Sequence, residues 1–124
     1  MPYSLTTWND FKNYQTTCYR NYLYASEGLR CMGSTWSVLA PLKGLGEDVY
    51  IMGGEPHAAS MAGTFPDEGR ENILAAESAG LGFHSCSYLK LFLGEVVRDR
   101  IAITDKTIKE GYPKPDLIWT THLC

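Results

Sequence analysis

The sequence predicts an α/β domain, of the Rossmann or flavodoxin-like kind, with a mostly parallel sheet flanked by helices. Helical patterns alternate with short apolar runs in the order helix, strand, helix, strand, helix, helix, strand. Two of the apolar runs lead into glycine and small polar residues, as strands do where they enter a site-forming loop. The 124 residues are enough to bury a core, so residues 1–124 are expected to form a single domain.

The first half of the chain supplies two of the predicted strands. A helix is expected over residues 7–27, because apolar side chains recur at helical spacing at Trp8, Phe11, Tyr14, Cys18, Tyr22 and Ala25. This stripe is expected to pack onto a neighbouring element. Strands are predicted over residues 29–33, with Cys31 in the core, and 48–52, with a short helix over 38–45 between them. The Gly-Gly-Glu-Pro-His run at 53–57 is predicted to be a loop.

The second half supplies two helices and the last strand. Asp67 is expected to cap a helix over 67–79 that ends at Gly80, and Ser85 a helix from Cys86 to about Arg98. The apolar side of the second helix is predicted to comprise Tyr88, Leu89, Phe92, Val96 and Val97. Residues 101–111 are predicted to be a polar loop with a short helical turn. A third strand is expected over 117–120, introduced by Pro-Lys-Pro-Asp.

Composition and cysteine spacing limit the function. The net charge of −3 gives no reason to expect nucleic-acid binding, which needs a basic face to offset the phosphate charge. No apolar run reaches the ~18 residues needed to cross a bilayer, and the N-terminus lacks the pattern of a secretory signal. A cytoplasmic, reducing setting follows, in which four cysteines are thiols or metal ligands rather than disulfides. No C-x-x-C pair occurs, so a metal site would have to draw on distant loops.

Residues with useful chemistry follow the carboxyl ends of the predicted strands, where parallel sheets bind ligands. Those ends bring Trp36, the pair Glu55 and His57, and Cys124 to one edge, and the helix start at Cys86 can face it. Amide groups and the dipole at a helix start favour a thiolate, the form that binds metal. Two alternatives stay open: Cys86 can be structural, as most cysteines at helix starts are, and Trp36 can either cover the core edge or line a pocket.

The sequence resembles a subunit of the benzoyl-CoA reductase / 2-hydroxyacyl-CoA dehydratase family, most closely the benzoyl-CoA reductase B-type subunit. The resemblance covers about residues 20–124. Each matching segment is weak evidence alone, and the specificity comes from the order and spacing of the segments together. They are Gly28-Leu29-Arg30, Gly33 to Ser37, Gly46 to Tyr50, Gly54-Glu55-Pro56, Ala75-Ala76-Glu77 with Gly80, Cys86-Ser87-Tyr88 with Gly94, and Pro113 to Cys124.

The resemblance implies that Cys86 and Cys124 are two ligands of a [4Fe-4S] cluster, whose third protein ligand lies further along such subunits. It implies partners: other reductase subunits, an ATP-hydrolysing iron-sulfur activator and an acyl-CoA substrate. Glu55 comes first as a substrate-binding residue, with Trp36 and His57 behind it, and no catalytic residue is assigned. Because relatives of this kind are expected to carry an aromatic residue after Glu-Pro, His57 departs from the pattern.

Three functions remain to be distinguished. The first is a cluster-binding subunit of an ATP-driven benzoyl-CoA reductase, which reduces the aromatic ring of benzoyl-CoA to a cyclic dienoyl-CoA in anaerobic aromatic degradation. The second is a subunit of a 2-hydroxyacyl-CoA dehydratase. The third is a non-catalytic α/β module for subunit association, to which the aromatic stripe of the first helix is suited. Because the sequence ends at Cys124 after a strand-like run, we expect a fragment, the N-terminal portion of a longer subunit.

Overall fold

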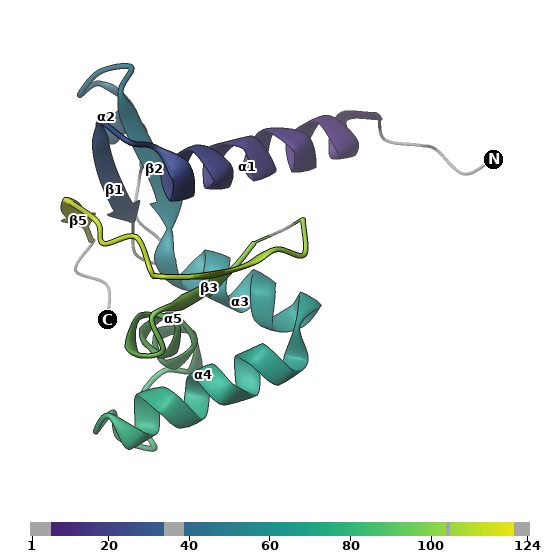
Figure 1. Ribbon diagram of the computed structural model, residues 1–124, viewed down its shortest axis with the longest axis vertical. Coiled ribbons are helices and arrows are strands. Elements are labelled where there is room, and N and C mark those ends of the chain that lie inside the picture. The colour runs from purple at the N-terminus through teal and green to yellow at the C-terminus, as the bar shows by residue number, and fades with distance from the viewer. Residues whose placement is uncertain (1–5, 34–38, 104, 121–124) are drawn as a thin grey trace.

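Three short parallel strands form the main sheet of the structure, a computed structural model that describes residues 6–33, 39–103 and 105–120 (Figure 1). They are β1 (Leu29–Gly33), β2 (Val49–Gly53) and β5 (Leu117–Trp119), in the order β2-β1-β5. The register places Gly33 beside Gly53 and beside Trp119. The carboxyl ends of all three strands therefore meet at one edge. Helices flank this sheet, so the α/β architecture is confirmed.

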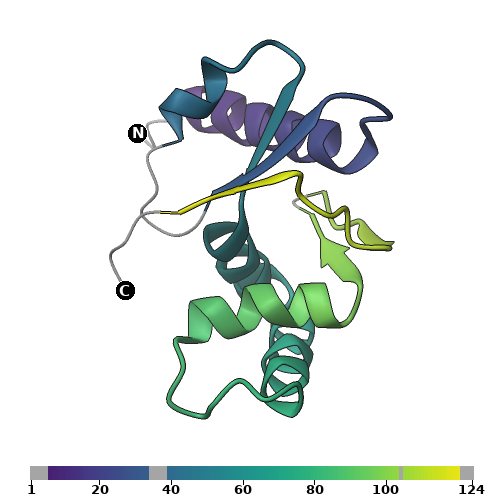
Figure 2. The same ribbon diagram turned by 90° about the vertical axis from the view of Figure 1, so that its left-hand side faces the viewer.

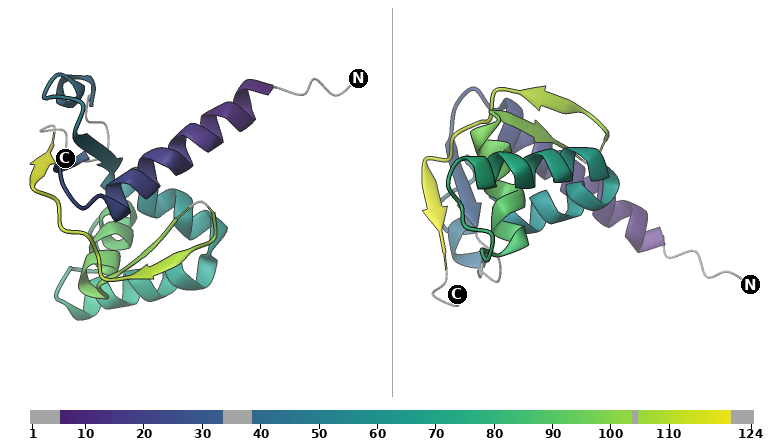
Figure 3. Two further views of the ribbon diagram at one scale, coloured as in Figure 1. Left: turned by 45° about the horizontal axis from the view of Figure 1, so that its top comes forward. Right: turned by 90° about the horizontal axis from the view of Figure 1, so that it is seen from below.

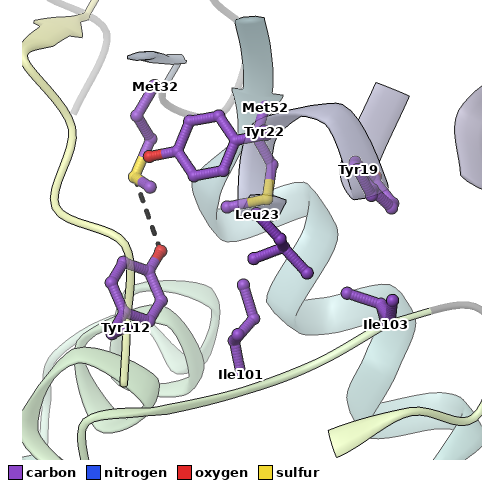
Figure 4. Close-up of a cluster of buried hydrophobic side chains, with 8 residues drawn as sticks. All are labelled: Tyr19, Tyr22, Leu23, Met32, Met52, Ile101, Ile103 and Tyr112. Atoms are coloured by element: carbon purple, nitrogen blue, oxygen red, sulfur yellow. Dashed lines mark hydrogen bonds between the residues drawn. The ribbon is translucent and has the colours of Figure 1, made fainter. Parts of the chain in front are cut away.

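The two faces of the sheet contribute to different cores, because neighbouring strand residues point to opposite sides. On one face, Met32 and Met52 join a large cluster that also contains Tyr19, Tyr22, Leu23, Ile101, Ile103 and Tyr112 (Figure 4). On the other face, Cys31 and Val49 are covered by Leu42 of the short helix α2 (Ala40–Lys43). Each large side chain buried in this way contributes about 1.5–3 kcal/mol.

The long helix α1 (Thr6–Tyr24) is only partly packed. Its C-terminal half buries Tyr19, Tyr22 and Leu23 in the large cluster, whereas its N-terminal half extends away from the sheet (Figures 1 and 3). There, Trp8, Phe11 and Tyr14 are each more than half exposed. The expected packing of the aromatic stripe is therefore wrong for these three residues, although Tyr14 does line a pocket beside α2 and β2.

Three further helices pack against one another below the sheet in Figure 1, with α4 farthest from it: α3 (Gly54–Thr64), α4 (Pro66–Ser78) and α5 (Ser87–Val97) (Figures 1 and 2). Helix α3 differs from the sequence prediction, which places a loop at residues 53–57. Gly54 instead allows close packing: a Cβ there would lie 3.0 Å from the Met32 sulfur and 3.2 Å from the Phe92 ring. Pro56 is tolerated because it falls in the first turn.

The buried side of α5 also differs from the prediction. Tyr88, Val96 and Val97 are exposed, while Lys90, Leu91, Gly94 and Glu95 are buried. The pattern of apolar residues predicts the wrong buried side of α5, because Lys90 and Glu95 are buried against partners on other elements. Two caps also move by a residue or two: Cys86 rather than Ser85 precedes α5, and Phe65 rather than Asp67 precedes α4.

A β-hairpin replaces the loop expected over 101–111. Strands β3 (Arg100–Ala102) and β4 (Ile108–Glu110) pair antiparallel, with Ile101 opposite Lys109. The polar composition concealed two short strands whose inward residue Ile101 is fully buried. The strands predicted over 29–33, 48–52 and 117–120 and the helices predicted over 38–45 and 67–79 are confirmed, with ends that differ by a few residues.

Candidate functional site

Cys86 stands immediately before the first turn of α5. Its φ and ψ of −54° and 131° are not helical, and its carbonyl accepts the first bond of the helix, from the Lys90 N–H at 3.0 Å. The preceding turn is closed by a bond from the Ser85 N–H to the Gly82 carbonyl at 2.9 Å. The thiol is free and exposed. A reagent or metal ion can therefore reach Cys86 without any rearrangement of the helix.

Lys90 fixes the segment in front of Cys86. Its ammonium is almost fully buried and donates to the Glu77 carboxylate at 2.6 Å and to the Phe83 carbonyl at 2.8 Å. Because Glu77 lies on α4 and Phe83 in the connection to α5, this side chain joins three segments. A buried charge is stable only when it is paired in this way. The sequence gives no direct sign of this role beyond a lysine within an apolar helix.

The contact between α4 and α5 fixes the direction of the helix that begins after Cys86. A Cβ on Gly94 would lie 2.0 Å from the Asn72 carbonyl oxygen, so the two helix backbones are nearly in contact. The Asn72 side chain accepts a hydrogen bond from the Arg98 guanidinium at 2.6 Å, and Arg98 also pairs with Glu68 at 3.0 Å. Residues at both ends of α5 are thus held to α4.

The start of α5 and the carboxyl end of β5 lie on the same side of the molecule (Figures 2 and 3). Cys124 and Trp36 themselves lie outside the described residues, so their predicted roles remain predictions. Within residues 6–33, 39–103 and 105–120, no group of three or more His, Cys, Asp or Glu side chains is placed to hold a metal ion.

Glu55 and His57 lie on the first turn of α3, directly after β2, and not on a loop as expected. Glu55 is half-buried at the carboxyl edge of the sheet. His57 is fully buried, and its ring packs edge-on against Tyr19 with centroids 4.6 Å apart. The substrate-binding role of each residue stays a prediction, but Glu55 is the better placed of the two to meet a ligand.

Two of the buried titratable groups, His57 and Glu95, have pKa values shifted strongly enough to keep them neutral. Burial lowers the pKa of His57 to about 4 and raises the pKa of Glu95 to about 8, so both are neutral at pH 7. Contact with the Ala102 main chain opposes both shifts. Glu95 was not anticipated from the sequence, because a carboxyl group on an apolar helix is normally solvated.

The other two described cysteines occupy different surroundings. Cys31 is fully buried in β1, as predicted, and burial raises the pKa of its thiol. Cys18 is half-buried on α1. It lines a pocket of about 350 Å³, together with Tyr14, Asn21, Leu39, Ala40, Lys43, Val49, Tyr50 and Ile51.

No family model, curated protein or solved structure matches this chain. The class of protein therefore rests on the fold, which is an α/β domain with a small three-stranded parallel sheet flanked by helices. Among the helices of the described residues, none combines the length and apolar character needed to cross a membrane.

Proposed function

We propose that this chain is a cluster-binding subunit of a benzoyl-CoA reductase-like enzyme, with a flavodoxin-like fold, acting in the cytoplasm. The observation that carries the proposal is the exposed, unpaired Cys86 thiol at the start of α5. The motif resemblance supports the same residue and adds Cys124. When bound, a [4Fe-4S] cluster would supply low-potential electron transfer, and Cys86 and Cys124 would hold it as thiolates.

The contribution of the chain's own residues is to position the ligands. The Lys90 contacts with Glu77 and Phe83 fix the turn before Cys86. Glu55, at the edge where the strands end, is proposed to contact the acyl-CoA. Such supporting contacts set the orientation of a ligand and the polarity around a metal centre.

Anaerobic reconstitution of the full chain with iron and sulfide tests the ligand assignment. We expect bound iron and sulfide with the broad visible absorbance of a cluster, labile because only two protein ligands are assigned. Cys86→Ala and Cys124→Ala should each abolish it. Cys18→Ala is the matched control, since it removes a half-buried thiol elsewhere. Equal iron content in Cys86→Ala and Cys18→Ala would refute the assignment.

Two alternatives remain. A dehydratase subunit would share the proposed fold and cluster, and assays with an ATP-hydrolysing activator and each class of thioester separate ring reduction from loss of water. A subunit-association module is favoured by the exposed Trp8, Phe11 and Tyr14 on the projecting half of α1. Sedimentation of the native chain and of Phe11→Ser tests that role, which predicts an assembly that the variant weakens without loss of helix content.

A further inference from the structure

One edge of β3 is bounded by side chains instead of by another strand. In the described residues, β3 pairs only with β4. The ladder includes bonds from the Ile103 N–H to the Thr107 carbonyl at 2.9 Å and from the Gly111 N–H to the Asp99 carbonyl at 2.7 Å. Because successive residues of an antiparallel strand direct their main-chain polar groups to opposite sides, the N–H and C=O of Ala102 face away from β4.

Two buried polar side chains meet this edge. The Glu95 carboxyl, from α5, hydrogen-bonds to the Ala102 main chain, and the His57 imidazole, from α3, lies against the same residue. Both side chains are at least 98% buried, since Glu95 is 2% exposed and His57 0%. Neither ring nitrogen of His57 has a well-formed hydrogen bond. Of the two Glu95 carboxyl oxygens, only one has such a bond. The imidazole contact with Ala102 is thus a weak one.

The charged and titratable groups around this edge come from every element packed against it. They are Tyr19 of α1, Glu55 of α3, Glu68 of α4, Arg98 of α5, Arg100 of β3 and Tyr112 after β4. Glu68 is paired with both arginines, at 3.0 and 3.2 Å. Arg98 therefore favours ionised Glu95 only weakly, because its guanidinium is shared with Glu68, whose own charge opposes that ionisation. The surroundings favour a protonated Glu95 carboxyl beside a neutral imidazole.

We propose that protonated Glu95, with neutral His57 packed beside it, forms a clasp that ties the free edge of β3 to α5, and that loss of the Glu95 proton releases the β3–β4 hairpin. The release follows from the cost of burying a carboxylate, because the hydrogen bond from Ala102 itself favours the ionised form. The hairpin carries Ile101 and Ile103 of the large cluster. Opening would loosen that core next to both α5 and the segment leading to β5.

The two groups make the opening equilibrium of the hairpin depend on pH in two stages. Opening returns Glu95 from a pKa of about 8 to its ordinary 4.5, and His57 from about 4 to 6.5. Between pH 5 and 6.5 the proton uptake of His57 and the proton loss of Glu95 offset each other, and the opening constant changes less than about twofold. Between pH 6.5 and 8 the effect of Glu95 outweighs the remaining titration of His57, and the opening constant rises roughly tenfold.

Amide hydrogen exchange of the native chain tests this clasp. The protection factor of the Ile103 amide, corrected for the intrinsic pH dependence of exchange, should fall about tenfold from pH 6.5 to 8. Glu95→Gln should remove this fall, whereas Glu71→Gln, an exposed carboxyl on α4, should retain it. The same fall in Glu95→Gln as in the native chain would overturn the clasp.

Direct titration of Glu95 keeps the test decisive if the variant does not fold. The carboxyl carbon of Glu95, followed by NMR in the native chain, should titrate near pH 8. A midpoint near the ordinary value of 4.5 would overturn the proposal whatever the variants show.

Discussion

Gly94→Ala should destabilise the protein although alanine is the better helix former. A Cβ at position 94 would lie 2.0 Å from the Asn72 carbonyl oxygen, and also 2.4 Å and 2.5 Å from two further Asn72 main-chain atoms. Neither helix can relieve this contact by a side-chain rotation, so α4 and α5 must separate. Overpacking usually costs about 1–3 kcal/mol, and a contact with main chain belongs at the upper end. Helix propensity returns only about 1 kcal/mol.

We therefore expect Gly94→Ala to lose about 2 kcal/mol of unfolding free energy, from a total of roughly 5–15 kcal/mol for a domain. Urea unfolding followed by far-ultraviolet circular dichroism measures it. Gly63→Ala is the matched control: this glycine is exposed in α3, no atom lies within 4 Å of its added Cβ, and the variant should gain up to about 1 kcal/mol. If Gly94→Ala is as stable as the native chain, the close approach of α4 and α5 is wrong.

Three further predictions concern thiol access, a buried ion pair and acid stability. Ellman's reagent should modify the exposed Cys86 in the native chain but reach Cys31 only on unfolding, and an unchanged number of fast-reacting thiols in Cys86→Ser would contradict this. Lys90→Met should cost about 1–3 kcal/mol in urea unfolding, because it leaves Glu77 without its ammonium partner, and an unchanged midpoint would show that the pair contributes nothing. For His57, the folded pKa of about 4 lies below the unfolded 6.5, so the stabilising effect of the neutral ring is present above pH 6.5 and lost as pH falls to 4. Urea unfolding should show the native chain losing up to ~3 kcal/mol relative to His57→Phe over that range, and a constant difference between the two would refute the shift.

Local sequence patterns were enough to predict the strands of the sheet but not the packing around it. The runs at 29–33, 48–52 and 117–120 are apolar and bounded by glycine or proline, so their strand character is local. Helix α3 was missed because Gly54 was interpreted as a flexible position. Its glycine is instead required by Met32 and Phe92, which only the tertiary structure brings there.

In the candidate site, too, local features could be predicted from the sequence and tertiary contacts could not. The start of α5 was predicted to within a residue, since a polar segment followed by an apolar run marks a helix boundary. The buried Lys90 and Glu95 could not be predicted, because their partners are distant in sequence or belong to the main chain. Glu77 lies 13 residues before Lys90, and Glu95 meets the main chain of a strand that was expected to be loop.

The central position of β1 has a consequence for the order in which the chain folds. One edge of β1 pairs with β2 soon after it in sequence, but the other waits for β5, whose approach is marked by the bond from the Arg30 N–H to the Asp116 carboxylate, 86 residues away. During synthesis, that edge stays open until nearly all of the described chain has emerged. An unpaired apolar strand edge is a template for aggregation. We therefore expect chaperones to be needed most before the segment around Asp116 has been synthesised.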